Sequence, residues 1–168
     1  MMRHLEAVSG DITAQRTDAI VNAANPQLAP GSGVCGAIFA AAGAGLAEAC
    51  LALGGCATGD AVATPAFDLP ARFLVHAVGP VWQGGNRDEP DLLASAYRRS
   101  LEVAEELGAT SIALPAISTG IYGYPLDAAT TVAVRTCRDA PAGHLDLVRF
   151  VCFDQPTLAA YLAALAQP

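Results

Sequence analysis

The segment from residue 19 to residue 38 limits most strongly what this chain can fold into. Residues 19–24 (AIVNAA) are mainly apolar, as in a short buried β-strand, and the run ends at Asn25. A loop rich in Gly and Pro follows, and an alanine-rich helix is predicted to begin near Val34. This order suits a phosphate group, because glycine allows close approach of backbone N–H groups and the first N–H groups of a helix are unpaired. The alternative is an ordinary strand-to-helix connection that binds no ligand.

The length and charge of the chain narrow the class of protein. With 168 residues we expect a single domain, residues 1–168, and 53% hydrophobic residues suit a compact core. The formal net charge of −7 argues against general binding of nucleic acids, because nucleic-acid-binding surfaces are basic. A small phosphate-bearing ligand remains compatible, since backbone amides and a helix dipole can hold it. We expect a small acidic domain of this kind to be a monomer.

The cysteines and the apolar segments indicate the cellular setting. The five cysteines are scattered without a CxxC pair, and the three histidines add no metal-ligand spacing. We therefore predict reduced thiols in a cytoplasmic protein, with no metal and no cofactor. The first residues form no apolar signal region. The most apolar segment, residues 34–53, is interrupted by Gly43, Gly45 and Glu48, so we expect a buried helix pair rather than a membrane span.

Strand patterns and helix patterns alternate along the chain. We predict strands at 4–9, 19–24, 60–66, 72–78, 111–115 and 145–153, and helices at 34–42, 44–53, 90–107, 126–138 and around Leu158, Tyr161, Leu162 and Leu165, with a short helical turn within 13–18. This alternation predicts an α/β domain with a largely parallel sheet. Ligands of such sheets bind beyond the carboxyl ends of the strands, where the candidate loops are residues 10–12, 25–36 and 118–123.

Five segments, taken together and in order, identify a family resemblance. They are GDIT (10–13), VNAAN (21–25), GSGVCGAI (31–38), HAVGPVW (76–82) and ISTGIYGYP (117–125), and they resemble the macrodomain family. The resemblance covers nearly the whole chain. It implies a three-layer α/β/α fold with a mixed, largely parallel central sheet, and it implies binding of ADP-ribose. The MacroD-like branch of this family hydrolyses ADP-ribose esters on acidic side chains and O-acetyl-ADP-ribose.

The resemblance assigns the adenine and ribose contacts. Asp11 would accept a hydrogen bond from the exocyclic amino group of adenine, although an aspartate read alone at this position is more often a turn or helix N-cap residue. Ile12 would offer a backbone donor to the same ring, and Asn25 would hold the distal ribose. Asn22 is expected to be structural. Phe153 is expected near the adenine, with a place in the core as the alternative.

The resemblance also assigns the two sides of a diphosphate site. Backbone amides would come from Gly33, Val34 and Gly36 on one side. On the other side they would come from Ser118, Thr119, Gly120, Ile121 and Tyr122, with the Tyr122 ring packed over the distal ribose. We assign His76 and Trp82 to the scaffold, because a lone histidine in a strand is usually a core residue with satisfied hydrogen bonds.

Cys35 departs from the pattern of the MacroD-like branch. Hydrolases of that branch resemble this chain around the loop but carry an aspartate where Cys35 stands. We therefore expect no aspartate-based mechanism, and we expect a water held by the substrate diphosphate, with Asn25 and Tyr122 as the catalytic residues. Cys35 would line the ligand site. In an alternative, its thiol is a nucleophile with a lowered pKa at the helix N-terminus, although no adjacent base is visible.

The expected function is hydrolysis at an ADP-ribose ester. The substrates would be ADP-ribosylated proteins modified on Glu or Asp, or O-acetyl-ADP-ribose. One alternative is a non-catalytic reader that binds ADP-ribose. Another is a phosphatase that acts on ADP-ribose 1″-phosphate.

Overall fold

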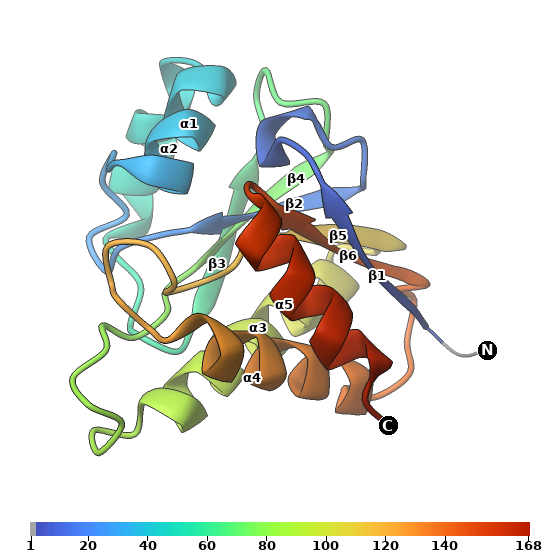
Figure 1. The fold of residues 1–168 in the computed structure, drawn as a ribbon. Coiled ribbons are helices and arrows are strands. Elements are labelled where there is room, and N and C mark those ends of the chain that lie inside the picture. Colours follow the sequence, from blue (N-terminus) through green and yellow to red (C-terminus); the bar gives the residue numbers. More distant parts are fainter. Residues whose placement is uncertain (1–2) are drawn as a thin grey trace.

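A six-stranded sheet runs through the middle of the molecule (Figure 1), in a computed structural model that describes residues 3–168. The strand order is β1-β6-β5-β2-β4-β3. Only β3 is antiparallel to its neighbour, and every other pair is parallel. The strands are β1 (His4–Ser9), β2 (Ala19–Ala23), β3 (Ala61–Pro65), β4 (Phe73–Ala77), β5 (Ser111–Leu114) and β6 (Leu147–Cys152).

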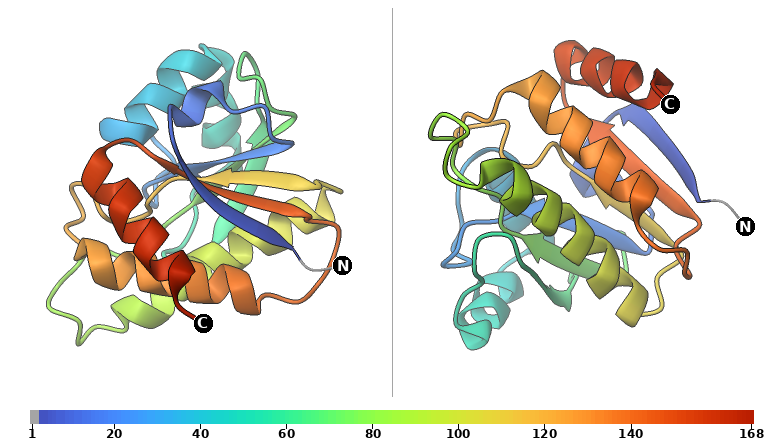
Figure 2. Two further views of the ribbon diagram at one scale, coloured as in Figure 1. Left: turned by 45° about the vertical axis from the view of Figure 1, so that its right-hand side comes forward. Right: turned by 90° about the horizontal axis from the view of Figure 1, so that it is seen from below.

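Helices cover both faces of this sheet, as Figures 1 and 2 show. One face carries α1 (Gly33–Ala42) and α2 (Gly45–Leu53), and the other carries α3 (Glu89–Glu106), α4 (Leu126–Asp139) and α5 (Gln155–Ala166). A short 3₁₀ helix, Ile12–Ala14, follows β1. The expected three-layer α/β/α fold with a mixed, largely parallel sheet is confirmed.

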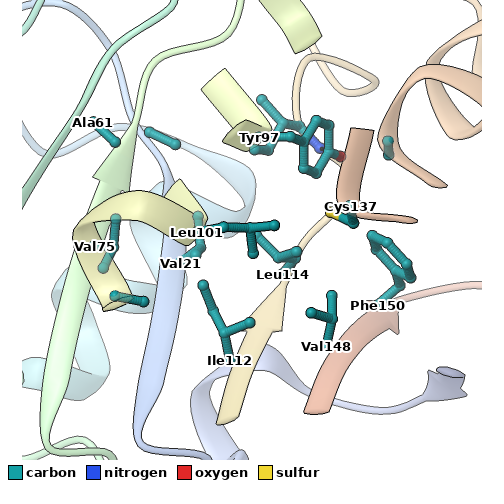
Figure 3. Packing of buried hydrophobic residues seen from close by; sticks show 14 of the residues in the cluster. Val21, Ala61, Val75, Tyr97, Leu101, Ile112, Leu114, Cys137, Val148 and Phe150 are labelled. Atoms are coloured by element: carbon teal, nitrogen blue, oxygen red, sulfur yellow. Dashed lines mark hydrogen bonds between the residues drawn. The ribbon is translucent and has the colours of Figure 1, made fainter. Parts of the chain in front are cut away.

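Alternate residues of each strand enter two separate cores. In β2, Ala19 and Val21 pack towards α3–α5, whereas Ile20 packs towards α1 and α2. This follows from the two-residue period of a strand, in which neighbouring side chains point to opposite faces. Figure 3 shows the larger core, where Ile112 and Leu114 of β5 and Phe150 of β6 point to the same side as Val21.

The predicted elements are all present, and their ends differ by a few residues. The last strand begins at Leu147 rather than at residue 145, and the helical turn is the 3₁₀ helix Ile12–Ala14. Of the four residues that predicted the last helix, Tyr161 provides its deep contact, whereas Leu162 is 50% exposed.

Membrane-spanning potential is confined to one bent pair of helices. Within residues 3–168, no single helix is long and apolar enough to cross a membrane. Helices α1 and α2 together are long and apolar enough, but the chain bends by 116° between them.

Candidate functional site

A cavity of about 220 Å³ opens between the carboxyl ends of β2 and β5. These strands are parallel neighbours. After β2 the chain turns to α1 on one face, and after β5 it turns to α4 on the other face (Figure 1). Adjacent strands whose connections leave to opposite faces create the crevice in which α/β proteins bind ligands.

The loop between β2 and α1 forms the first wall of this cavity. The Asn25 side chain fixes the loop, because its Nδ2 donates to the carbonyl oxygen of Ala29 (2.8 Å) and its Oδ1 accepts from the N–H of Ala29 (3.0 Å). The N-cap residue of α1, Ser32, makes no side-chain capping bond. Gly33 starts the helix with a φ of 60°, a conformation that glycine adopts without strain. The first N–H groups of α1 are therefore free to meet an anion.

The loop between β5 and α4 forms the second wall. It is folded on itself, since Tyr124 N–H donates to the carbonyl oxygen of Ser118 (2.9 Å) and Gly123 N–H to that of Gly120 (3.0 Å). Ser118 has a φ of 70°, which is rare for a residue other than glycine. Its buried Oγ has no hydrogen-bond partner among residues 3–168. A strained residue with an unpaired polar atom in a cavity is typical of a functional site.

Helix α3 holds the beginning of the second wall. The hydroxyl of Tyr97 accepts a hydrogen bond from the N–H of Ile117 (3.1 Å) and lies 3.1 Å from the hydroxyl of Tyr161. Both tyrosines are buried. The second wall is thus tied to the interior through Tyr97.

Gly79 lies where the two walls meet the end of β4. A Cβ atom at this position would stand 2.2 Å from Ser118 Oγ and 2.5 Å from Ile117 Cγ2. Such distances are far below van der Waals contact, so only glycine fits here without a shift of the second wall.

Most of the predicted site residues meet at this cavity. Those that line it are Asn25, Gly33, Val34, Cys35, Ser118, Gly120, Ile121 and Tyr122. The amides of the remaining two diphosphate candidates are engaged within the protein: Gly36 N–H donates to the carbonyl oxygen of Ser32, and Thr119 N–H to that of Ala116. Sequence reasoning missed the other lining residues, which are Ala23, Ala24, Gly31, Ser32, Gly79, Ala116 and Ile117. Of these, Gly79 could have been predicted, because it is a glycine that directly follows the predicted strand 72–78.

The adenine candidates lie together at the far end of the same sheet edge. Asp11 and Ile12 follow β1, Phe153 follows β6, and these strands are paired through Ser9 and Cys152. Asp11 caps the 3₁₀ helix, since its Oδ1 accepts from the N–H and the hydroxyl of Thr13, which lowers the pKa of its carboxyl group. The alternative that Phe153 belongs to the core is wrong, because this side chain is 90% exposed.

Cys35 lies in the first turn of α1, where its side chain is buried. Its Sγ donates to the carbonyl oxygen of Ala29 (3.6 Å) and receives a contact from Asn22 Nδ2 (3.7 Å). Burial raises the pKa of this thiol, and the hydrogen bond from Asn22 opposes the change only in part. The hypothesis of a lowered pKa at Cys35 is therefore wrong, since desolvation outweighs the hydrogen bonds from Asn22 and from the Gly31 backbone.

Asn22 connects Cys35 to a buried histidine. Parallel register places Asn22 of β2 beside His76 of β4, so both side chains enter the face below α1 and α2. Asn22 Nδ2 can only donate, so His76 Nδ1 accepts (3.1 Å) and His76 Nε2 carries the proton towards Thr64 Oγ1 (3.0 Å). The Thr64 hydroxyl in turn donates a hydrogen bond to the carbonyl oxygen of Pro65 (3.0 Å). His76 is thus a scaffold residue, as expected.

The free energy of unfolding should depend on pH through the protonation of His76. Burial lowers the pKa of His76 from 6.5 to about 4. Between these values the unfolded chain binds a proton that the folded chain does not, so the free energy of unfolding should fall with falling pH, by up to about 3 kcal/mol in all. Urea unfolding of wild type and His76→Gln at pH 7, 6, 5 and 4 measures this. The variant should lose less stability over that range, and parallel curves for the two proteins would contradict the assignment.

Metal ligation and disulfide bonding give no competing explanation of the site. Among residues 3–168, no group of three or more His, Cys, Asp or Glu side chains could hold a metal ion. The five cysteines are free and buried.

Comparison with known proteins agrees with this geometry. The model of the Macro domain family matches residues 21–133. The chain belongs to the macrodomain family. The matched segment of this macrodomain contains both walls of the cavity and Gly79.

Similar proteins cover the whole macrodomain. A macro domain-containing protein of Chlorobaculum tepidum is 51% identical, over 96% of this chain and 95% of that protein. The O-acetyl-ADP-ribose deacetylase of Escherichia coli (strain K12) is 48% identical, over 99% of this chain and 98% of that protein. A Trypanosoma brucei macrodomain in complex with ADP-ribose superposes with a TM-score of 0.91 at 38% identity, over 97% of this chain and 69% of that chain.

Proposed function

We propose that this macrodomain binds ADP-ribose in the cavity between β2 and β5 and hydrolyses its esters. The substrates would be O-acetyl-ADP-ribose and proteins that carry ADP-ribose on Glu or Asp. The observation that carries the proposal is the pair of facing walls, which offer the N-terminus of α1 on one side and the loop of residues 116–124 on the other. The 48% identity to an O-acetyl-ADP-ribose deacetylase supports the reaction class.

The ligand would extend along the carboxyl edge of the sheet. The diphosphate would lie between the amides of Gly33 and Val34 and those of Gly120 and Ile121. No protein acceptor is found for these N–H groups of the second wall within residues 3–168, which leaves them available to an anion. The adenine would then lie towards Asp11 and Phe153, which follow β1 and β6, and the distal ribose would lie towards Asn25.

The proposed reaction needs no acidic residue of the protein. The first turn of α1 contains none. For an ester of a Glu or Asp side chain at C1″, a phosphate oxygen of the bound substrate would hold a water beside C1″. The water oxygen would attack C1″ as the side-chain carboxylate leaves and takes the bonding electrons. The proton of the water passes to the phosphate oxygen and then to solvent. Asn25 would fix the ribose hydroxyl groups and the half-buried Tyr122 ring would restrict the other face. Positioning of this kind supplies several kcal/mol of the barrier reduction.

Release of ADP-ribose tests the proposal. The protein is incubated with O-acetyl-ADP-ribose and, separately, with a protein auto-modified on Glu and Asp, while free ADP-ribose is measured and its affinity is determined by calorimetry. Release from either substrate supports a hydrolase. Binding without release would establish the reader function instead, which the absence of an acid in the first turn of α1 favours. Release of phosphate from ADP-ribose 1″-phosphate alone would establish the phosphatase.

Replacing Cys35 by alanine should leave most of the activity. Its thiol has a raised pKa and donates to Ala29, so it is a poor nucleophile, and the position contributes backbone and space. We expect a loss of less than about tenfold in kcat/KM, measured with O-acetyl-ADP-ribose. An inactive Cys35→Ala protein with unchanged affinity for ADP-ribose would restore the thiol as the nucleophile.

A further inference from the structure

Glu89 is the first residue of α3, and its carboxylate is buried beneath the loop before the helix. The residue is 1% exposed. Its Oε2 accepts from the N–H groups of Gln83 (2.8 Å) and Gly85 (3.0 Å), and its Oε1 accepts from that of Arg87 (2.6 Å). This carboxylate therefore binds three amides of its own loop. We call the loop of residues 83–87 and the Glu89 carboxylate the Glu89 clamp.

The clamp holds its carboxylate in the charged form. Burial would by itself raise the pKa of Glu89, but the backbone N–H groups of Gln83, Gly85, Arg87 and Glu89 itself more than offset this and lower it to about 2. The loop therefore keeps its charge-assisted hydrogen bonds throughout the physiological pH range.

The clamp adjoins the second wall of the cavity through Trp82. The backbone N–H of Trp82 donates to the carbonyl oxygen of Tyr122 (2.8 Å). The Trp82 and Tyr124 rings lie 4.7 Å apart, centroid to centroid. A Cβ atom at Gly85 would stand 2.9 Å from the Trp82 ring, so the clamp packs directly on the indole. The green loop before α3 and the golden loop before α4 lie side by side in Figures 1 and 2.

We propose that Glu89 is a positioning residue for the ADP-ribose site. Its carboxylate fixes the loop of residues 83–87, this loop fixes Trp82, and Trp82 fixes Tyr122 and the second wall. The inference rests on the proposed function for its ligand. It goes beyond the proposed function by placing a determinant of affinity outside the cavity, at the first residue of α3, the helix whose Tyr97 also contacts the second wall.

A local role in the stability of α3 is the competing explanation, and α3 itself supplies a matched control. Glu105 lies near the other end of the helix, and its two oxygens accept from the N–H groups of His144 (2.5 Å) and Leu145 (2.9 Å). These amides precede β6, at the amino edge of the sheet, far from the cavity. Glu105 Oε1 also pairs with Arg3 (3.4 Å), so Glu105→Gln weakens this ion pair in addition to the same kind of backbone contact, on the same helix and without reaching the second wall.

The central experiment compares Glu89→Gln with Glu105→Gln. Gln has nearly the same shape as Glu but only one acceptor oxygen. In Glu89→Gln, at least one of the three backbone N–H groups of the clamp therefore loses its acceptor. We expect Glu89→Gln to weaken ADP-ribose binding about tenfold and to lower kcat by a similar factor, because a small displacement of a positioning wall is costly. Glu105→Gln should lower the melting temperature to a similar degree without changing the affinity. Equal affinities for Glu89→Gln and wild type would overturn the proposal.

Tryptophan fluorescence gives a second readout that a purely structural role would not change. Trp82 is the only tryptophan of the chain. In ligand-free Glu89→Gln its emission should move to longer wavelength, whereas Glu105→Gln should resemble wild type. Gly85→Ala provides a second variant if Glu89→Gln does not fold. Its methyl group would stand 2.9 Å from the indole, and the φ of 91° at this position adds backbone strain to the same loop, while the carboxylate remains. It should reproduce both effects, and unchanged emission in either variant would contradict the clamp.

The two proposals fail in different ways. If wild type does not bind ADP-ribose, the proposed function fails, yet the emission of the ligand-free variants still tests the link from Glu89 to Trp82. If wild type binds and Glu89→Gln binds equally well, only the positioning role fails.

Discussion

Asn25→Ala should lower the rate of ADP-ribose ester hydrolysis by about a hundredfold or more. The side chain is expected to hold the distal ribose, and in the free protein it bridges to both backbone groups of Ala29. Its loss therefore removes a substrate contact and loosens the first wall at once. The measurement is kcat/KM with O-acetyl-ADP-ribose, together with the melting temperature.

Asn25→Asp separates these two effects. Aspartate retains an acceptor for the N–H of Ala29 but cannot donate to the carbonyl oxygen. We expect an intermediate loss of activity and a weaker binding of the ribose hydroxyls that need a donor. Activity of Asn25→Ala within a few fold of wild type would remove Asn25 from the catalytic residues.

Gly79→Ala should weaken ADP-ribose binding by about a hundredfold. The new methyl group would occupy a point 2.2 Å from Ser118 Oγ and 2.5 Å from Ile117 Cγ2, so the second wall must move by about 1 Å to accept it. Overpacking of this kind costs about 1–3 kcal/mol of stability, which a well-folded domain can tolerate. Calorimetry with ADP-ribose gives the affinity, and a thermal melt confirms that the variant is folded.

A second substitution tests the cause of this loss. Ser118→Ala removes the oxygen that lies closest to the new methyl group, and the Ser118 Cβ would remain at 3.4 Å. The double variant Gly79→Ala/Ser118→Ala should therefore recover part of the affinity, as expected for neighbours whose effects are not additive. If the double variant binds as weakly as the sum of the single effects predicts, the clash with Ser118 is not the cause.

The fold and the main cavity loops were predictable because their signals are local. Apolar runs, glycines and caps fix the order of strands and helices, and parallel strands bring the loops after β2 and β5 to one edge. The adenine candidates Asp11 and Phe153 fall on that edge for the same reason.

Contacts between distant segments were not predictable in the same way. Gly79 resembles a turn glycine in the sequence, and its decisive neighbour, Ser118, comes from a different strand connection. Glu89 resembles a solvated acid in a first helical turn, and the partners that explain its burial are backbone amides, which every residue type supplies. Cys35 contacts Asn22 of β2, which lies 13 residues earlier in the sequence and on a different element.

The pairing of β1 with β6 has a consequence for folding during synthesis on the ribosome. β1 is synthesised before the other strands of the sheet, yet its partner β6 is synthesised after all of them. Asp11 and Phe153 can therefore become neighbours only after β6 has emerged from the ribosome, whereas both walls of the central cavity are already available once α4 is complete. A nascent chain stalled after α4 would thus have the diphosphate half of its site without the nucleobase half. Ligand capture by nascent chains of increasing length would follow that order of assembly.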